Sequence, residues 1–399
     1  MPIGLTGQQQ HVFLGVLLLW VYVLPTEARP QQSDLFKQID KDLHHFRNGI
    51  SIEMVEQVYC SNSDQGFRLQ VLGNKLYVAG EIVDNSSKAR NRNIKMQLLE
   101  LSQRHALPDI DVYITTDDWP QVSQQNVSAA CPQQGPLLCQ AKLDTRPHAL
   151  LMPDWTFYDW SSEQNPGWAD LKYILQAASD DNGWHTRLPK LFFRGNNATG
   201  TRSIVAETNL EPYESLDIKA WFWPKHRHEF VSLLDHCKHK YLLNWPGHSY
   251  SARLKALLQC GSAVVYPTNG WYEFYYGLLK HGENIVMMNH LEKPSDITQN
   301  LTAVVNILKQ YDDKARQIGV EGQYVTQNIL TPDNIQEYWR RLLTGYAKLM
   351  QFEPHLHPDA IGIGKSLTTS AYLGYDLSNR TCSVCVHHAS AGVRWDRNQ

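Results

Sequence analysis

Residues 241–265 have the pattern of an anion-binding turn between a strand and a helix. An apolar run ends at Asn244, a turn with Gly247 follows, and a helical pattern begins at Ser251 with Arg253 in its first turn. Backbone N–H groups at the start of a helix lack partners within the helix and attract anions. An arginine adds a forked donor that matches a diphosphate. The segment indicates a phosphate site, although an ordinary strand–helix turn with a surface arginine shows the same pattern.

The elements around this turn alternate between strands and helices. The expected strands are 190–193, 241–244, 263–266 and 284–288, and the expected helices are 251–259, 296–310, 313–328 and 332–350. Such alternation implies a mainly parallel sheet with right-handed crossovers. Ligands of such sheets bind outside the carboxyl ends of the strands.

The first half of the chain is expected to mix both element types. The predicted elements are a hairpin over 67–80, a helix over 88–105, short strands over 111–116 and 149–152, and a helix over 169–178. Residues 121–145 are rich in Gln, Ser and Pro and read as a loop that Cys131 and Cys139 could staple. The polar stretch 179–183 is the best boundary between the halves. The tail beyond residue 353 reads as irregular.

The amino terminus and the glycosylation motifs favour the secretory pathway. Residues 12–24 form an apolar run of 13 residues, shorter than the roughly 20 that span a bilayer, with Ala28 as a possible cleavage position. A short uncleaved anchor is the alternative. Five Asn-x-Ser/Thr motifs and seven cysteines suit an oxidising lumen. A formal net charge of −3 gives no reason to expect nucleic acid as a partner.

Six blocks of sequence, taken in order, carry a resemblance to a known family. They are residues 118–122, 153–157, 191–195, 235–244, 253–262 and 273–276. Together they resemble the glycosyltransferase family 90 domain, which includes Rumi-type protein O-glucosyltransferases and capsule-associated xylosyltransferases. Each block is weak alone, and their order and spacing carry the match.

The resemblance implies an α/β, GT-B-like fold with two Rossmann-like domains facing across a cleft. Residues 1–28 would be the signal peptide or anchor, 29–182 the acceptor-side domain, 183–352 the nucleotide-sugar domain with the final helix, and 353–399 the tail. Members invert at the anomeric carbon without a metal or cofactor. We therefore expect a monomer that moves glucose or xylose from a UDP-sugar to a protein or glycan hydroxyl, in the endoplasmic reticulum or Golgi.

The family's catalytic base falls on Asp118, and its diphosphate-binding arginine falls on Arg253. One carboxylate opposite the leaving group must take the acceptor proton, and positive charge must stabilise the UDP that leaves. Asp117 competes for the base role or contacts the substrate, because neighbouring strand residues face opposite ways. A turn-forming Asp pair is the plain alternative. The other residues expected at the donor site are Arg194, Gly195, Arg202, His248, Ser249, Tyr250, Ser251, Ala252 and Glu273.

Other expectations from the resemblance are less direct. Rumi-like members carry a further arginine where this chain has Asn197, and Arg202 is expected to replace it. Glu273 is expected to hold the ribose hydroxyls, with a helix-surface role as the alternative. Trp155 and Phe157 are expected near the acceptor and the sugar, with core packing as the alternative. The family disulfide falls on Cys237 and Cys260, so the resemblance implies that these two cysteines are bonded.

Two other classes of function stay open at this stage. The chain could be a non-catalytic carbohydrate- or protein-binding relative, as Asn197 suggests, or a hydrolase that uses Asp117 or Asp118 with Glu273. The sequence Asp109-Ile-Asp111 matches a metal motif of other glycosyltransferases, but it precedes a strand instead of following one. We therefore expect no metal site there.

Overall fold

The structure is a computed structural model that describes residues 28–61, 66–82, 87–118, 135–161, 165–208, 210, 213–222 and 230–364. Its strands are β1 (Gly66–Leu72), β2 (Lys75–Ile82), β3 (Ile110–Thr115), β4 (Leu137–Cys139), β5 (Ala149–Leu151), β6 (Leu188–Asn196), β7 (Leu216–Trp221), β8 (His239–Leu243), β9 (Ala263–Thr268), β10 (Val286–Asn289) and β11 (Ile361–Ile363). Its α-helices are α2 (Gln32–Leu43), α3 (Ile52–Ser61), α4 (Ser87–Arg104), α5 (Trp168–Asp181), α6 (Arg202–Glu207), α7 (Leu233–His236), α8 (Leu254–Gln259), α9 (Pro294–Gln310), α10 (Asp312–Tyr324) and α11 (Pro332–Leu349). Short 3₁₀ turns are η1 (His44–Phe46), η3 (Trp155–Phe157), η5 (Trp184–Thr186) and η7 (Tyr276–Leu278), and η8 (Val325–Ile329) is a π-helix.

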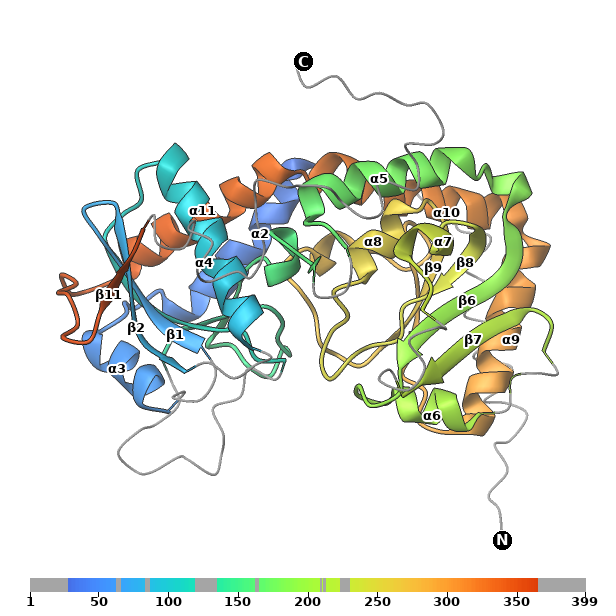
Figure 1. The fold of residues 1–399 in the computed structure, drawn as a ribbon, viewed down its shortest axis with the longest axis horizontal. Helices are drawn as coiled ribbons and strands as arrows, with labels where there is room; N and C mark the ends of the chain where they lie inside the picture. Colours follow the sequence, from blue (N-terminus) through green and yellow to red (C-terminus); the bar gives the residue numbers. More distant parts are fainter. Residues whose placement is uncertain are drawn as a thin grey trace, which may run out of the picture.

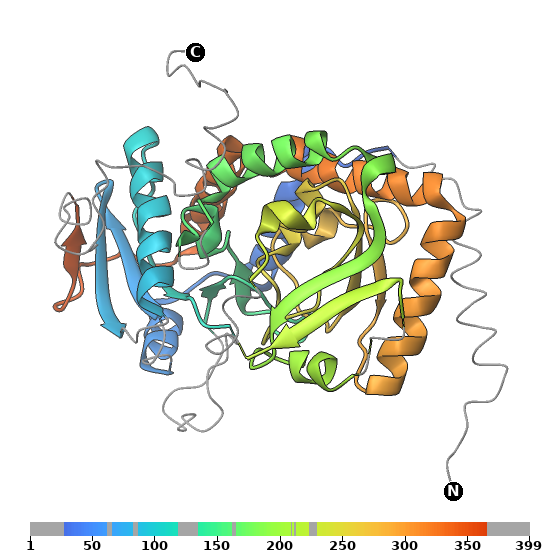
Figure 2. The same ribbon diagram turned by 45° about the vertical axis from the view of Figure 1, so that its right-hand side comes forward.

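The strands form two sheets, one at each end of the molecule in Figure 1. The carboxyl-terminal sheet has the order β10-β9-β8-β6-β7, and every pair in it is parallel. Apolar side chains of β6, β8 and β9 are buried on both faces of this sheet. Fully covered strands of this kind are typical of parallel sheets in α/β proteins. Figure 2 shows α9 and α6 beside one side of this sheet, with α5 along its top.

The amino-terminal sheet is mixed, with the order β11-β2-β1-β3-β4-β5. Strands β3, β4 and β5 are parallel, whereas β1 pairs antiparallel with both β2 and β3. The hairpin turn is Gly73-Asn74, with φ of 56° and 61°. Two successive positive φ values define the turn that matches the twist of a two-residue hairpin. The predicted α/β class with two sheets, in a GT-B-like arrangement, is confirmed.

Three strands lie where the sequence did not predict them. Strand β4 falls within the segment expected to be a loop, β7 was missed, and β11 pairs with β2 within the tail expected to be irregular. Strands β4 and β11 are short, and β7 and β11 lie at sheet edges. A local pattern cannot identify them, because the pairing that stabilises them is non-local.

The last helix returns to the amino-terminal sheet. Thr331 caps α11 by accepting a hydrogen bond from the backbone of Asn334. Along α11, Trp339 Nε1 donates to Gln97 of α4, and Tyr346 OH donates to the carbonyl of Asp111. Figure 1 shows α11 beside α2 above that sheet. The apolar face of α11 therefore packs on the amino-terminal sheet, whereas the sequence grouped this helix with the carboxyl-terminal half.

One apolar core runs through both halves of the molecule. It includes side chains of β1, β3 and α11 from one half and of β8, α8 and the segment after β9 from the other. Among the described residues, no helix has both the length and the apolar character needed to cross a membrane. The apolar run at residues 12–24 lies outside the described residues.

Candidate active site

A pocket of about 450 Å³ opens at the carboxyl edge of the parallel sheet. Its walls come from the segments that follow β6, β8, β9 and β10, which is where ligands of parallel sheets bind. The lining residues are Gly200, Thr201, Gly247, His248, Asn269, Trp271 and His290. The sequence predicted His248 and the turn at Gly247 among them. Applying the strand-end rule to every loop, instead of to the glycine-containing turn alone, would have found the others.

One wall of this pocket carries the hydroxyl of Thr201 and the imidazole of His290. Thr201 Oγ1 accepts a hydrogen bond from Trp245 Nε1 at 3.1 Å and lies 3.5 Å from His290 Nε2. Burial lowers the pKa of His290 below its usual range, against a smaller opposing effect of Glu292. Its Nδ1 is buried without a hydrogen-bond partner among the described residues. A neutral imidazole beside a hydroxyl suits an uncharged polar ligand group, such as a sugar or a nucleoside.

The turn after β8 presses against the loop after β6. Gly247 N–H donates to the carbonyl of Tyr250 at 2.9 Å and closes the turn. Gly200 has φ +57°, and a Cβ there would lie 2.1 Å from the carbonyl oxygen of Gly247. Only glycine allows this approach. The Gly200 N–H also donates to His248 Nδ1 at 3.3 Å, so the two loops form one wall of the pocket.

Arg253 follows this turn and points back toward β6. Its Nη1 donates to the carbonyl of Arg194 at 2.5 Å, and its guanidinium carbon lies 5.1 Å from the ring centre of Phe193. Helix α8 begins only at Leu254 and has six residues, so it is shorter than the sequence predicted. The positive charge at this edge of the sheet therefore comes from the Arg253 side chain more than from a helix terminus.

The two other predicted arginines hold the protein itself. Arg202 Nε donates to the carbonyl of Pro246 at 3.1 Å, and its Nη2 donates to the carbonyl of Trp245 at 3.2 Å. Arg194 forms an ion pair with Asp217 of β7 at 2.6 Å. Arg202 therefore braces the turn after β8, and Arg194 is directed toward β7 instead of the pocket.

Gly195 has a packing role in this arrangement. A Cβ at this position would lie 2.6 Å from the ring of Phe193 and 3.3 Å from the Arg202 side chain. The missing side chain lets the Phe193 ring fold across the end of β6, beneath Arg202 and Arg253. Gly195 thus shapes the edge on which the arginines sit.

The turn itself carries buried polar groups. The hydroxyls of Ser249 and Ser251 and both side-chain atoms of Asn244 are buried without hydrogen-bond partners among the described residues. Native proteins rarely leave such groups unmatched unless a ligand, ion or water completes them. Ala252 follows, half-buried, and its carbonyl accepts from Lys255 Nζ at 3.0 Å.

Asp118 lies at the carboxyl end of β3 and is held by an arginine that the sequence did not single out. Arg90 of α4 donates to Asp118 Oδ1 at 2.9 Å and to Oδ2 at 3.3 Å. The Asp118 side chain is 32% exposed, so solvent still reaches it. Asp117 is half-buried, and its backbone N–H donates to the side chain of Thr115. Trp119 and Pro120 lie outside the described residues.

Trp155 and Phe157 take different positions on η3. Trp155 is half-buried, and its ring lies 5.8 Å from the Arg90 guanidinium carbon. Phe157 is buried and packs edge-on against Trp168 and Phe274. The structure therefore places Trp155 beside the Asp118–Arg90 pair, whereas Phe157 packs in the core, as in the alternative that the sequence left open.

Glu273 is completely buried and does not line the pocket. Burial raises its pKa well above the usual range, and the nearby Asp154 raises it further. Tyr275 OH donates to it at 3.3 Å. The predicted contact with a ribose does not fit this placement, because the side chain faces the interior between the two halves.

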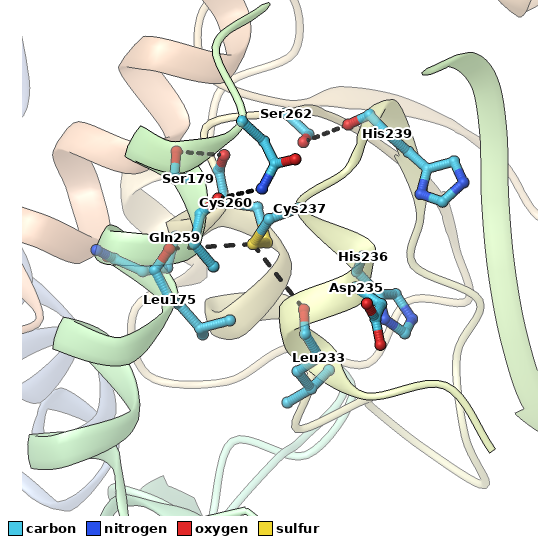
Figure 3. Close-up of a disulfide and its surroundings, with 12 residues drawn as sticks. Leu175, Ser179, Leu233, Asp235, His236, Cys237, His239, Gln259, Cys260 and Ser262 are labelled. Carbon is cyan, nitrogen blue, oxygen red and sulfur yellow. Dashed lines mark hydrogen bonds between the residues drawn. A yellow bond between two sulfur atoms is a disulfide. The ribbon is translucent and has the colours of Figure 1, made fainter. Parts of the chain in front are cut away.

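Cys237 and Cys260 form a disulfide, the pair that the family resemblance implies. It joins the end of α7 to the end of α8, next to α5 (Figure 3). Ser179 of α5 donates to the carbonyl of Cys260 at 2.8 Å. The bond therefore anchors the far end of the helix that begins after Arg253.

Cys139 is a free thiol within β4. It is fully buried, and burial raises its pKa to about 12. The predicted disulfide between Cys131 and Cys139 is therefore wrong, because Cys139 is free. Cys131 lies outside the described residues. A buried thiol behaves as a small apolar side chain in the core.

Asp111, the second carboxylate of the discounted metal motif, belongs to a buried network. It pairs with Arg68 at 2.7 Å and accepts a hydrogen bond from Gln70. Asp109 accepts from the backbone of Gly73 in the hairpin turn. Both carboxylates therefore stabilise the amino-terminal sheet.

The site and fold together define a two-lobed α/β protein with a polar pocket at the carboxyl edge of a parallel sheet. Residues 27–384 match the family model described as glycosyl transferase family 90. The chain belongs to this family and is a glycosyltransferase by membership.

Curated relatives agree with the family. The chain is 28% identical to bovine protein O-glucosyltransferase 1, over 79% of this chain and 80% of the relative. It is 29% identical to O-glucosyltransferase rumi of Drosophila melanogaster, over 85% of this chain and 84% of the relative. A solved structure of Anabaena HepE in complex with UDP-glucose matches 43% of this chain and 44% of HepE, with 15% identity and a TM-score of 0.29. That structural likeness is too weak to support an argument.

Proposed function

We propose that this protein is an inverting, metal-independent glycosyltransferase of the secretory pathway. It moves glucose or xylose from a UDP-sugar to a hydroxyl of a protein or glycan. Family membership and the O-glucosyltransferase relatives support the reaction class. The disulfide and the glycosylation motifs support an oxidising lumen of the endoplasmic reticulum or Golgi.

The observation that carries this proposal is the closeness of Asp118 to the turn after β8. Burial raises the pKa of Tyr250 well above its usual range, and the negative charges of Asp154, Glu273 and Asp118 raise it further. Gln140 accepts a hydrogen bond from Tyr250 OH and donates to the carbonyl of Thr116, two residues before Asp118. The segment that carries Asp118 is thus linked, through Gln140 and Tyr250, to the turn that leads to Arg253.

In the proposed mechanism, the donor occupies the pocket with its diphosphate against Arg253 and the backbone of residues 247–252. Asp118 removes the proton of the acceptor hydroxyl as the hydroxyl attacks the anomeric carbon, and the bond to the UDP oxygen breaks. Arg253 stabilises the negative charge that develops on UDP. Arg90 holds the Asp118 carboxylate in place, and Trp155 lines the acceptor side.

The test compares Asp118→Asn with Asp117→Asn. Purified proteins are assayed for UDP release from UDP-glucose and UDP-xylose, and UDP binding is measured by calorimetry. We expect Asp118→Asn to lower kcat by about 10²-fold or more, with UDP affinity within about twofold of wild type. Asp117→Asn should keep most of the activity. Near-normal turnover by Asp118→Asn would refute the assignment of the base.

A non-catalytic binding protein is the second candidate function. Two observations favour it. Asn197 stands where Rumi-like members carry an arginine, and the Asp118 carboxylate is already paired with Arg90. Absence of UDP binding in the calorimetric titration would favour this candidate. Binding of UDP together with release of UDP from a UDP-sugar would exclude it.

A further inference from the structure

Gln140 lies where the two halves of the molecule meet, between the segments proposed to carry out the reaction. It is buried, with 1% of its surface exposed, in the segment that follows β4. Its Nε2 donates to the carbonyl of Thr116 at 3.0 Å. Its Oε1 accepts from Tyr250 OH and from the Trp155 backbone N–H, each at 3.2 Å.

These three partners belong to three separate parts of the site. Thr116 precedes Asp118 at the end of β3, Trp155 opens η3 beside Arg90, and Tyr250 belongs to the turn that leads to Arg253. One amide therefore contacts the base segment, the acceptor-side turn and the donor turn. An amide is suited to this because it donates and accepts at once and carries no charge.

A buried ion pair makes a second connection across the same boundary. Lys255 of α8 lies 3.3 Å from Asp154 Oδ2, and its Nζ donates to Thr156 Oγ1 at 2.6 Å. Asp154 also accepts from the backbone of Thr156 and so caps η3. A third connection is made by the backbone: Lys142 and Tyr272 exchange two N–H···O hydrogen bonds of 3.1 and 3.0 Å. Gln140, two residues before Lys142, adds a side-chain connection across the same boundary.

We infer that Gln140 is a positioning residue that fixes the base segment relative to the donor turn, so that the two halves present Asp118 and Arg253 at a constant separation. This inference rests on the proposed roles of those two residues. An error of about 1 Å in the placement of reacting groups can lower a rate by about a hundredfold. Loss of the Gln140 amide should therefore affect turnover more than donor binding.

The test is Gln140→Met, which keeps the length of the side chain and removes all three hydrogen bonds. The matched control is Gln70→Met, because Gln70 is also fully buried and makes three hydrogen bonds, to Asp111, His355 and His357. That network lies at the opposite end of β3 from Asp118. Both variants should lower the free energy of unfolding by similar amounts. Only Gln140→Met should change the positions of the Asp118 segment and the donor turn.

Two measurements separate the possibilities. Hydrogen exchange of the amides of residues 115–118 and 247–253 should become at least about tenfold faster in Gln140→Met and remain unchanged in Gln70→Met. For UDP release from UDP-glucose or UDP-xylose, kcat should fall about 10- to 100-fold in Gln140→Met, with KM for the donor within about twofold.

Each outcome decides a different point. Unchanged exchange in both segments of Gln140→Met would overturn the coupling, whatever the enzyme activity. Faster exchange with an unchanged kcat would overturn the positioning role. Equal losses of kcat in Gln140→Met and Gln70→Met would overturn the positioning role, because a general loss of stability would then explain both. If the wild-type chain neither binds UDP nor releases it from a UDP-sugar, the proposed function fails, and the exchange data still decide the coupling.

Discussion

The buried pair of Lys255 and Asp154 makes a strong prediction about stability. Both side chains are fully buried at the boundary between the two halves. Lys255→Met removes the cation and leaves the Asp154 carboxylate with only the hydrogen bonds from Thr156. Burying a charge without its partner typically destabilises a protein by about 3–5 kcal/mol. The neighbouring Glu273 is another carboxyl group and cannot supply the positive charge that Asp154 would lose, and Asp154 already raises the pKa of Glu273.

The double variant Asp154→Asn/Lys255→Met should be much closer to wild type. Removing both charges leaves no buried ion, so we expect a loss of about 1–2 kcal/mol, and a coupling energy of at least about 2 kcal/mol in the double-mutant cycle. Urea unfolding at constant pH measures all four proteins. In thermal unfolding, Lys255→Met should lower Tm by roughly 4–6 °C, because the entropy of unfolding grows with chain length.

The control for this cycle is Lys238→Met. Lys238 pairs with Asp235 at 2.6 Å on the surface, where both side chains are about half exposed. Such pairs contribute about 0–1 kcal/mol, because water and salt screen them. Two results would refute the reasoning about a buried and coupled pair. The first is a loss of unfolding free energy in Lys255→Met no larger than that in Lys238→Met. The second is a loss in the double variant larger than the sum of the losses in the two single variants.

Two further predictions concern α7 and the disulfide beside it. Replacing Cys237 and Cys260 by Ala should lower the free energy of unfolding by about 3 kcal/mol, because the bond closes a loop of 23 residues, and urea unfolding with unchanged stability would contradict this. Burial lowers the pKa of His236 from 6.5 to about 3, so below pH 6.5 this histidine binds a proton in the unfolded chain but not in the folded chain. The contribution of His236 to the free energy of unfolding is therefore fully present above pH 6.5 and falls by up to about 1.4 kcal/mol per pH unit toward pH 3. His236→Gln should flatten this dependence of unfolding free energy on pH, and an unchanged slope would show that the histidine is not buried.

The parts of the fold that the sequence predicts well are those determined by neighbouring residues. The hairpin around Gly73-Asn74 follows from two residues that tolerate positive φ between alternating apolar positions. The start of α11 follows from Thr331 and the proline after it. Strands β7 and β11 could not be found in this way, because another strand must complete their hydrogen bonds: β6 for β7, and the distant β2 for β11.

The candidate site divides along the same line. A local pattern is enough to identify the turn before Arg253 and the carboxylate of Asp118. It does not reveal Arg90 or Gln140, because a polar residue in a helix or loop has no local sign of its partner. Nor does it show that Phe157 faces the core, since an aromatic residue beside a site and one beneath it look alike in sequence.

The placement of the arginines bears on how this chain could bind a donor without the family arginine at Asn197. Arg194 is paired with Asp217, and Arg202 holds the carbonyls of the turn after β8. Neither is positioned as a substitute for the missing charge. Under the proposed function, Arg253 therefore supplies the main positive charge for the diphosphate. The rest of the donor affinity must come from neutral groups such as His290, whose interactions are less sensitive to salt than ion pairs are.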